Sequence, residues 1–384
     1  MRKWGNLPAA ALAVGAAAIL AQSCARHRPV SAPRPADPPV VAPTPKPLPR
    51  PVAAAELRGV WVSDPSHLNW DTATANLQRS GFNTMYVNFA SGGAAFYPGS
   101  QVLPTAAGYG TDAFSKGIAL AHRRGLAVHA KLIVMFLFKA PPEFQKQMVR
   151  ANRVMRGPDN HPILQSGFAW WCPSQEANRS FLKGCVQELL TRYPSLDGLQ
   201  FDYLRFSEQP SCFCPHCRLE FERSLGHKVR SWPASVQGGM LTTEFLEWRT
   251  RLIDSWAQQL GALARQTRPG LRVSCAVFSD LDRAREEKAQ DWKAWLDRGY
   301  LDYVCTMTYT PDLREFERLV RKQQSWATGR GQLVVGIGSW KFAQMAPLSA
   351  EIDITRRLGA AGFALFSYDD AEARNFLPNL AAKN

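Results

Sequence analysis

The sequence is short of acidic residues: 32 aspartates and glutamates stand against 46 lysines and arginines, a formal net charge of +14 at pH 7. Such an excess fits a nucleic-acid-binding protein. Residues 1–52, however, hold seven of the basic residues and only one acidic residue, an excess of six. The remaining net charge of +8 fits contact with anionic envelope polymers better than with nucleic acid, and a mildly basic surface without a specific partner explains it as well. We therefore predict no nucleic-acid partner.

A glycine-rich dinucleotide-binding fingerprint is also absent after the first apolar run, which argues against an open doubly wound sheet. The apolar runs alternate with longer amphipathic segments, as strands and helices do. Eight runs begin at Leu57, Phe82, Leu126, Gly198, Leu271, Leu301, Gln332 and Gly362. Helices are expected between them, over residues 70–81, 111–125, 174–193, 242–266, 291–299, 313–327 and 349–360. Eight strand–helix repeats predict an α/β fold, a (β/α)₈ TIM barrel over residues 56–384.

The first 23 residues have the pattern of an export signal. A positively charged start is followed by an alanine- and leucine-rich core and by small residues before Cys24, which is typical of a signal peptide and not of a membrane span. Ala21-Gln22-Ser23 suits ordinary signal peptidase, but a cysteine directly after a small residue also resembles a bacterial lipobox, from which Ala21 and Gln22 depart. We expect an exported cell-envelope protein, anchored to the membrane by a lipid on Cys24 and facing the periplasm.

Residues 24–55 are interpreted as a linker. The stretch from Pro29 to Pro51 is rich in proline, which favours an extended, semi-rigid polyproline II conformation and cannot build a core. A spacer in this place supports the interpretation of Cys24 as a lipid anchor.

Polar side chains gather where the predicted strands end. In a (β/α)₈ barrel the chemistry belongs at the C-terminal ends of the strands. The polar residues at these ends are Ser63, Asp64, Asn88, His129, Lys131, Asp202, Arg205, Ser279, Asp280, Thr308, Tyr309, Ser339, Trp340, Tyr368, Asp369 and Asp370. The strand starts are mostly apolar, so this rim is the expected site.

The fourth run, "GLQFDYLRF", carries a carboxylate inside a segment that should be buried. Alternation along a strand puts Gln200 and Asp202 on one face and the apolar residues on the other, so Asp202 is expected to point into the barrel mouth. A carboxylate there is costly unless it is paired or hydrogen-bonded. Arg205 and Lys131 are the candidate partners, and a purely structural salt bridge is the competing explanation.

The segments "ELRGVWVS" at the first strand and "DGLQFDYLRF" at the fourth together resemble glycosyl hydrolase-like family 10, bacterial envelope (β/α)₈ barrels that are often lipoproteins. The resemblance covers about residues 56–370. It implies a glycoside hydrolase that cleaves cell-wall glycan strands of the peptidoglycan type, and it carries over to Asp202 within F-D-Y-x-R. The sequence departs from the family in Phe206-Ser207, where relatives often have an aromatic residue followed by proline, and in its cysteine-rich loop.

Glycoside hydrolysis usually needs two carboxyl groups that flank the scissile bond. Asp202 is the first, as nucleophile or general base. For the second we favour Asp369 and Asp280, with Asp370 and Glu208 as further candidates; the separation of the pair decides between retention and inversion. Because only one carboxylate is assigned, a non-catalytic glycan-binding envelope lipoprotein is the alternative.

The candidates for substrate binding are polar groups and aromatic rings expected near the rim, since sugar rings stack on aromatic faces. They are Arg205, Asn88, His129, Lys131, Tyr309, Trp340, Trp171 and Tyr368, with Trp170, Phe96 and Tyr97 as further subsite candidates. Packing in the core or in a loop is the competing explanation for each aromatic side chain.

Four cysteines, Cys172, Cys212, Cys214 and Cys217, fall in the loops after the third and fourth strands. These loops lie side by side in a barrel, so the four thiols could meet. Two disulfides are expected outside the cytoplasm. A structural zinc site is the alternative, because C-x-C-x₂-C spacing suits tetrahedral sulfur ligation. "CPHC" also matches the active-site tetrapeptide of thiol oxidoreductases, although no separate thioredoxin-like segment surrounds it. No other cofactor is expected.

Overall fold

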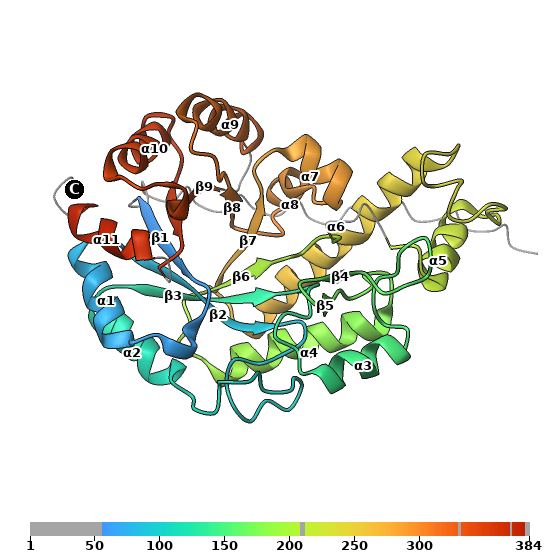
Figure 1. The fold of residues 1–384 in the computed structure, drawn as a ribbon, viewed down its shortest axis with the longest axis horizontal. Helices are drawn as coiled ribbons and strands as arrows, with labels where there is room; N and C mark the ends of the chain where they lie inside the picture. The colour runs from blue at the N-terminus through green and yellow to red at the C-terminus, as the bar shows by residue number, and fades with distance from the viewer. Residues whose placement is uncertain (1–55, 208–211, 329–331, 369–370, 381–384) are drawn as a thin grey trace, which may run out of the picture. The chain divides into compact units, whose positions relative to one another are not determined.

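The structure is a computed structural model of the chain, and it describes residues 56–207, 212–328, 332–368 and 371–380 (Figure 1). The predicted signal peptide, Cys24 and the linker lie outside the described residues. Three of the candidate carboxylates, Glu208, Asp369 and Asp370, also lie outside them.

Eight parallel strands close into a barrel in the order β1-β10-β9-β8-β7-β6-β3-β2. They are β1 (Leu57–Val62), β2 (Thr84–Ser91), β3 (Ala127–Ile133), β6 (Gly198–Asp202), β7 (Arg272–Phe278), β8 (Tyr303–Met307), β9 (Gln332–Gly338) and β10 (Gly362–Phe366). Each barrel strand pairs with the next one along the chain, and β1 closes the ring by pairing with β10. Every strand overlaps one of the eight apolar runs, so the prediction of a TIM barrel is confirmed.

Helices surround the barrel (Figure 1). They are α1 (Trp70–Arg79), α2 (Phe114–Arg123), α3 (Pro142–Arg150), α4 (Glu176–Arg192), α5 (Pro215–Leu225), α6 (Thr242–Thr267), α7 (Leu281–Lys288), α8 (Trp292–Asp297), α9 (Leu313–Trp326), α10 (Met345–Arg357) and α11 (Ala371–Leu380), with short 3₁₀ turns at Pro65–His67 and Ser339–Lys341. The helices predicted from the sequence do not include α3, α5, α7 or α11. In α3 only Met148 is buried. Within the part of the chain that the structure describes, no helix has the length and apolar character needed to cross a membrane.

A short hairpin, which the sequence analysis did not predict, stands outside the barrel sheet. Its strands β4 (Leu164–Gln165) and β5 (Phe168–Ala169) are antiparallel. The turn between them has Ser166 at φ 49° and Gly167 at φ 81°, and two successive left-handed residues are typical of tight hairpin turns. Figure 1 shows the hairpin beyond the tips of β3 and β6.

The inner face of the barrel confirms the alternation predicted for the fourth run. Leu199 and Phe201 belong to the core shared with the surrounding helices. Gln200 and Asp202 point inward, and Trp61 Nε1 donates a 2.6 Å hydrogen bond to Gln200 Oε1. The inward layer beneath the barrel mouth consists of Leu57, Trp61, Tyr86, Ala276, Tyr303, Cys305, Val334 and Ala364. This layer fills the barrel interior beneath the side chains at the C-terminal ends of the strands.

Candidate active site

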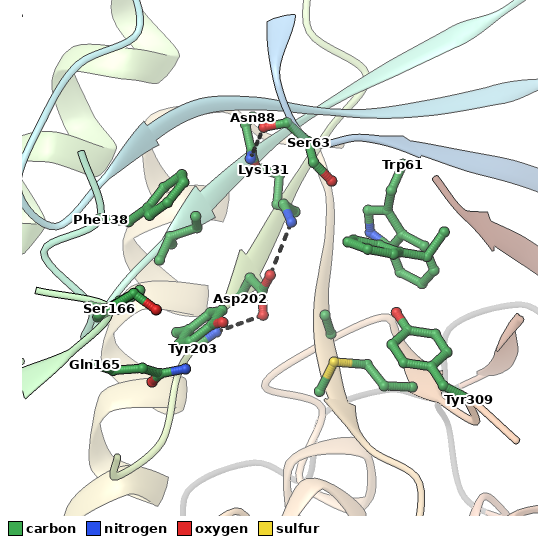
Figure 2. A pocket seen from close by; sticks show the side chains of 15 residues that line it. Trp61, Ser63, Asn88, Lys131, Phe138, Gln165, Ser166, Asp202, Tyr203 and Tyr309 are labelled. Carbon is green, nitrogen blue, oxygen red and sulfur yellow. Dashed lines mark hydrogen bonds and ion pairs between the residues drawn. The ribbon is translucent and has the colours of Figure 1, made fainter. Parts of the chain in front are cut away.

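A cavity of about 360 Å³ opens at the C-terminal end of the barrel (Figure 2), within the size range of small-ligand sites. Its lining is mostly aromatic and aliphatic, from Trp61, Ile133, Phe136, Phe138, Tyr203, Ala276, Met307, Tyr309 and Phe366. The polar lining residues are Ser63, Asn88, Lys131, Gln165, Ser166 and Asp202. The combination of flat apolar faces with a few polar groups suits a ligand that has both hydroxyl groups and apolar ring faces.

The two charged lining residues form an ion pair between neighbouring strands. Asp202 ends β6, Lys131 lies on β3, and the Lys131 Nζ atom is 3.0 Å from Asp202 Oδ2. Both residues are nearly buried, with exposed fractions of 7% for Asp202 and 4% for Lys131. Their mutual attraction offsets part of the cost of removing each charge from water. Of the two cations that the sequence offered as partners, the structure pairs Lys131 with Asp202.

Tyr203 turns the chain directly after the carboxylate. Its φ of 53° lies in the left-handed region, which is uncommon for a tyrosine and is often found at functional sites. In this conformation the Tyr203 N–H donates to Asp202 Oδ1 over 2.8 Å. Asp202 therefore accepts from Lys131 on one oxygen and from Tyr203 on the other (Figure 2), which fixes the orientation of the carboxylate.

Arg205 lies behind the cavity wall rather than among the lining residues. Its guanidinium carbon is 4.6 Å from the centre of the Tyr203 ring and 5.1 Å from that of Trp170. The guanidinium also donates to the Phe206 carbonyl over 3.0 Å. The sequence analysis expected Arg205 to bind substrate; in the structure it supports Tyr203, whose ring also lies nearly parallel to that of Phe136, with the ring centres 5.2 Å apart.

Tyr309 forms the opposite side of the cavity with Phe366, their ring centres 5.7 Å apart (Figure 2). Burial raises the pKa of the Tyr309 hydroxyl well above its usual value, and the negative charge of Asp202 raises it further. The hydroxyl therefore stays protonated and can donate a hydrogen bond. Trp340 packs edge-on against Tyr309 at 4.9 Å and keeps 40% of its surface exposed, so it stands beside the cavity with part of its ring accessible.

The amide side chains of Asn88 and Gln165 line the cavity, and each has an oxygen atom that accepts no hydrogen bond from the described residues. Asn88 Nδ2 donates to the Ser63 carbonyl over 2.5 Å. The Oδ1 atom of Asn88 and the Oε1 atom of Gln165 are buried, and neither has a hydrogen-bond partner among the described residues. Buried acceptors are normally satisfied, so these oxygen atoms suit a ligand that donates hydroxyl hydrogens.

Asp202 is the one acidic residue among the described residues that line the cavity. Asp280 instead caps α7, where it accepts from the backbone N–H groups of Asp282 and Arg283, and it lies 3.4 Å from Lys322. Partial burial raises the pKa of Asp280, but these hydrogen bonds and the lysine outweigh that effect and lower it. These contacts indicate that Asp280 stabilises the N-terminus of α7.

Asp64, which follows β1, is an acidic residue that the sequence analysis placed at the rim but did not assign to catalysis. Its carboxylate lies 2.9 Å from Lys139 Nζ and accepts from the Tyr109 hydroxyl over 2.7 Å. Partial burial raises the pKa of Asp64, and the bonds from Lys139, Ser66 and Tyr109 overcome this effect and hold it well below its usual range. Asp64 therefore remains an anion and does not suit proton donation.

Several aromatic residues expected at subsites are core residues. Trp171, Trp170, Phe96 and Tyr97 are at most 1% exposed. The Trp171 indole donates to the Gly92 carbonyl over 2.8 Å and packs among other rings. Complete burial leaves no ring face for a sugar, so the competing explanation, packing, accounts for these four residues.

His129 and Tyr368 also lie away from the cavity lining. His129 is buried inside the barrel, where its Nδ1 atom is 3.1 Å from the Tyr303 hydroxyl. Burial and the positive charge of Arg272 lower the pKa of His129 to about 3, so it is neutral. The Tyr368 hydroxyl accepts from Asn76 over 3.3 Å. Both side chains therefore have structural partners instead of the predicted substrate contacts.

The four loop cysteines, which the sequence analysis expected to meet, do meet. The sulfur atoms of Cys172, Cys212, Cys214 and Cys217 all lie within 4.8 Å of one another, and all four residues are buried. They are free thiols in the structure, without the two disulfides that the sequence analysis preferred. The cluster lies outside the cavity lining, so its chemistry is separate from that of Asp202.

Residues 56–346 match the family described as Glycosyl hydrolase-like 10. Among curated proteins, Glycosyl hydrolase DigH of Escherichia coli strain K12 is 21% identical over 349 residues, which cover 77% of this chain and 76% of DigH. The same protein from E. coli O6:H1 is 21% identical over 355 residues, with the same shares of the two chains covered.

Among solved structures, the PgaB (BpsB) glycoside hydrolase domain from Bordetella bronchiseptica superposes with a TM-score of 0.65 at 17% identity, over 84% of this chain and 99% of that domain. The β-galactosidase from Rahnella sp. R3 superposes with a TM-score of 0.63 at 15% identity, over 85% of this chain and 55% of that enzyme. At these identities the likeness shows the barrel fold alone.

Proposed function

Because the chain belongs to glycosyl hydrolase-like family 10, we propose that it is a glycoside hydrolase whose substrate is a glycan strand of the bacterial cell wall. Asp202 supplies the reacting carboxylate, as nucleophile or as general base. One observation carries the proposal: the Asp202 carboxylate, oriented by Lys131 and Tyr203, lies at an aromatic-lined cavity at the C-terminal end of a (β/α)₈ barrel.

The aromatic and the amide residues of the cavity lining make different contacts with a sugar. Phe136 and Tyr203 on one side, and Tyr309 on the other, offer apolar ring surface against which a sugar ring can pack. The free acceptor atoms of Asn88 and Gln165 take up hydroxyl hydrogens. These contacts hold the anomeric carbon above Asp202.

The chemistry of Asp202 follows from its charge and position. Positive charge develops at the anomeric carbon as the glycosidic bond breaks, and a fixed anion stabilises it. As a nucleophile Asp202 forms a bond to this carbon, whereas as a general base it removes a proton from the attacking water. Lys131 keeps the carboxylate oriented in both cases.

The second carboxyl group must give a proton to the leaving oxygen. We keep Asp369 as the first proposal because it follows β10 in the sequence, and β10 lies four strands from β6 in an eight-stranded ring, directly across the barrel mouth. Asp280 follows β7, the neighbour of β6, and its existing contacts at α7 make it the weaker proposal.

The cell-wall substrate and the place of action rest on the sequence. The first-strand and fourth-strand motifs imply an envelope glycan, and the N-terminal pattern implies export with a lipid on Cys24. With the proline-rich linker as a spacer, the barrel works at the periplasmic face of the envelope.

Purified protein incubated with cell-wall glycan strands, freed of peptides by an amidase, tests the proposal. Wild type is expected to release soluble fragments, measured by chromatography and mass spectrometry. Asp202→Asn keeps the shape of the side chain and removes its charge, so the rate should fall about 10²- to 10⁴-fold. Asp312→Asn is the matched control, because Asp312 caps α9, is not among the residues that line the cavity, and asparagine caps equally well.

A non-catalytic glycan-binding role is the second candidate, and the single described carboxylate in the cavity lining favours it. Under this alternative, wild type and Asp202→Asn bind glycan strands in a pull-down with comparable affinity and neither releases fragments. Fragments from wild type and from Asp312→Asn, but not from Asp202→Asn, exclude it.

A further inference from the structure

The cysteine cluster joins two segments that are distant in the sequence. Cys172 comes three residues after β5, the second strand of the hairpin. Cys212 and Cys214 lie in the loop between β6 and α5, and Cys217 lies in the first turn of α5. The Cys172 sulfur is 3.5 Å from the sulfur atoms of both Cys214 and Cys217.

We propose that Cys172, Cys212, Cys214 and Cys217 bind one zinc ion in a tetrahedral four-thiolate site. Zn–S bonds of about 2.3 Å place the corners of a tetrahedron about 3.8 Å apart. The two 3.5 Å separations and the overall limit of 4.8 Å match this arrangement before any adjustment of the side chains.

A pair of disulfides fits the cluster less well. A disulfide brings two sulfur atoms to about 2.05 Å and makes each of them the exclusive partner of the other. Cys172, however, is equally distant from Cys214 and Cys217. Four mutually adjacent sulfur atoms are the geometry of a shared central ligand, and not of two separate bonds.

The surroundings of the sulfur atoms suit thiolates. All four cysteines are at most 2% exposed. The backbone N–H groups of Arg156 and Cys217 approach Cys212 Sγ and Cys214 Sγ at 3.4 Å, and such donors stabilise sulfur ligands in metal sites. Arg249, which is 2% exposed, interacts electrostatically with Cys217. Four thiolates and one Zn²⁺ carry two net negative charges, which a buried arginine partly balances.

A zinc ion at this site would link the β4–β5 hairpin to the segment that follows Tyr203, and both segments contribute to the cavity. Residues Gln165 and Ser166 of the hairpin line the cavity, and Trp170, between the hairpin and Cys172, packs against Tyr203 at 5.4 Å. The other three ligands follow Tyr203 along the chain. A metal ion that holds both segments therefore holds the hairpin beside the residue that orients Asp202. Its effect on glycan cleavage rests on the proposed function, whereas metal binding itself does not.

Metal analysis of the full chain tests the site independently of activity. Protein from zinc-supplemented cells should contain one zinc per chain by plasma mass spectrometry. Cys172→Ser and Cys214→Ser should each lower the content at least fivefold. Cys185→Ala is the matched control, because Cys185 is buried in α4 outside the cluster, and it should keep one zinc.

Cobalt substitution of the wild-type chain keeps the test valid if the variants fail to fold. Tetrahedral thiolate ligation should give intense visible d–d bands and a sulfur-to-cobalt charge-transfer band, both removed by one equivalent of zinc. Peptide mapping without reductant, done on protein recovered from the periplasm, should find no disulfide among the four cysteines. Disulfides there, zinc below 0.2 per chain, or insulin reduction that depends on Cys214 and Cys217 would overturn the proposal.

Discussion

The Asp202 carboxylate and the Lys131 ammonium lie 3.0 Å apart on neighbouring strands, where the barrel opens into the cavity. The pair contributes differently to folding and to function. It offsets the cost of burying each charge, and it orients a carboxylate that lines the cavity. Changing either partner should therefore affect stability as well as activity.

Removal of the Lys131 side-chain charge tests the contribution of the ion pair to stability. Lys131→Met leaves the Asp202 charge buried without its cation, and we expect a loss of about 3–5 kcal/mol in the free energy of unfolding, measured with urea. The double variant Lys131→Met with Asp202→Asn should lose less than the sum of the single changes. Lys322→Met, which removes a half-buried cation that pairs with Asp282 and Asp280 near the surface, should cost about 1 kcal/mol or less. Additive losses at Lys131 and Asp202 would contradict the pairing.

Tyr309→Phe tests the hydroxyl that faces Asp202. Since burial and the charge of Asp202 keep this hydroxyl protonated, its removal should lower kcat/KM about tenfold through the loss of one hydrogen bond of about 1.4 kcal/mol. Wild-type activity should show no alkaline loss from ionisation of Tyr309. Tyr368→Phe, whose hydroxyl bonds Asn76 outside the cavity lining, should keep its activity, and an equal loss in both variants would refute the assignment.

Two tryptophans that look alike in the sequence should respond oppositely. Trp340→Ala removes a ring that is 40% exposed beside the cavity, so binding of glycan fragments should weaken while thermal stability changes little. Trp171→Ala opens a void in the core and should cost about 3–5 kcal/mol of stability. Calorimetric titration and thermal unfolding measure the two effects. Unchanged glycan binding by Trp340→Ala would remove Trp340 from the site.

Glu351 on α10 is expected to make the stability of the protein depend on pH. It is fully buried, neither carboxylate oxygen has a hydrogen-bond partner among the described residues, and burial raises its pKa from 4.5 to about 9. The folded protein therefore keeps this proton when the unfolded chain releases it. The contribution of Glu351 to the free energy of unfolding is therefore complete below pH 4.5 and decreases as the pH rises toward 9. The largest possible decrease is about 1.4 kcal/mol for each unit by which the pKa of the folded state exceeds that of the unfolded state.

Glu351→Gln removes the titrating group. The variant should lose this part of the pH dependence and be more stable than wild type by a few kcal/mol at pH 9. Urea unfolding at pH 5, 7 and 9 measures it. Asp353→Asn, which replaces another carboxyl group on the same helix, is the matched control. Parallel stability curves for wild type and Glu351→Gln would contradict the effect of burial on Glu351.

Much of the barrel could be predicted because its signals are local. The eight apolar runs stand at strand positions, and the two-residue period within "GLQFDYLRF" already directs Asp202 inward, as the contact of Gln200 with Trp61 confirms. The hairpin around Gln165 could not be predicted, since its strands are only two residues long and no periodicity develops over that length.

By itself, the sequence determined the eight-stranded barrel, the inward direction of Asp202 and the rim at which polar groups gather, because each depends on the spacing of residues along one strand. Only the tertiary structure decided which cation meets Asp202, that Trp171 and His129 are buried, and that four cysteines converge. These outcomes depend on distances between segments far apart in the chain, which are set by how strands and loops pack together and leave no pattern in neighbouring residues.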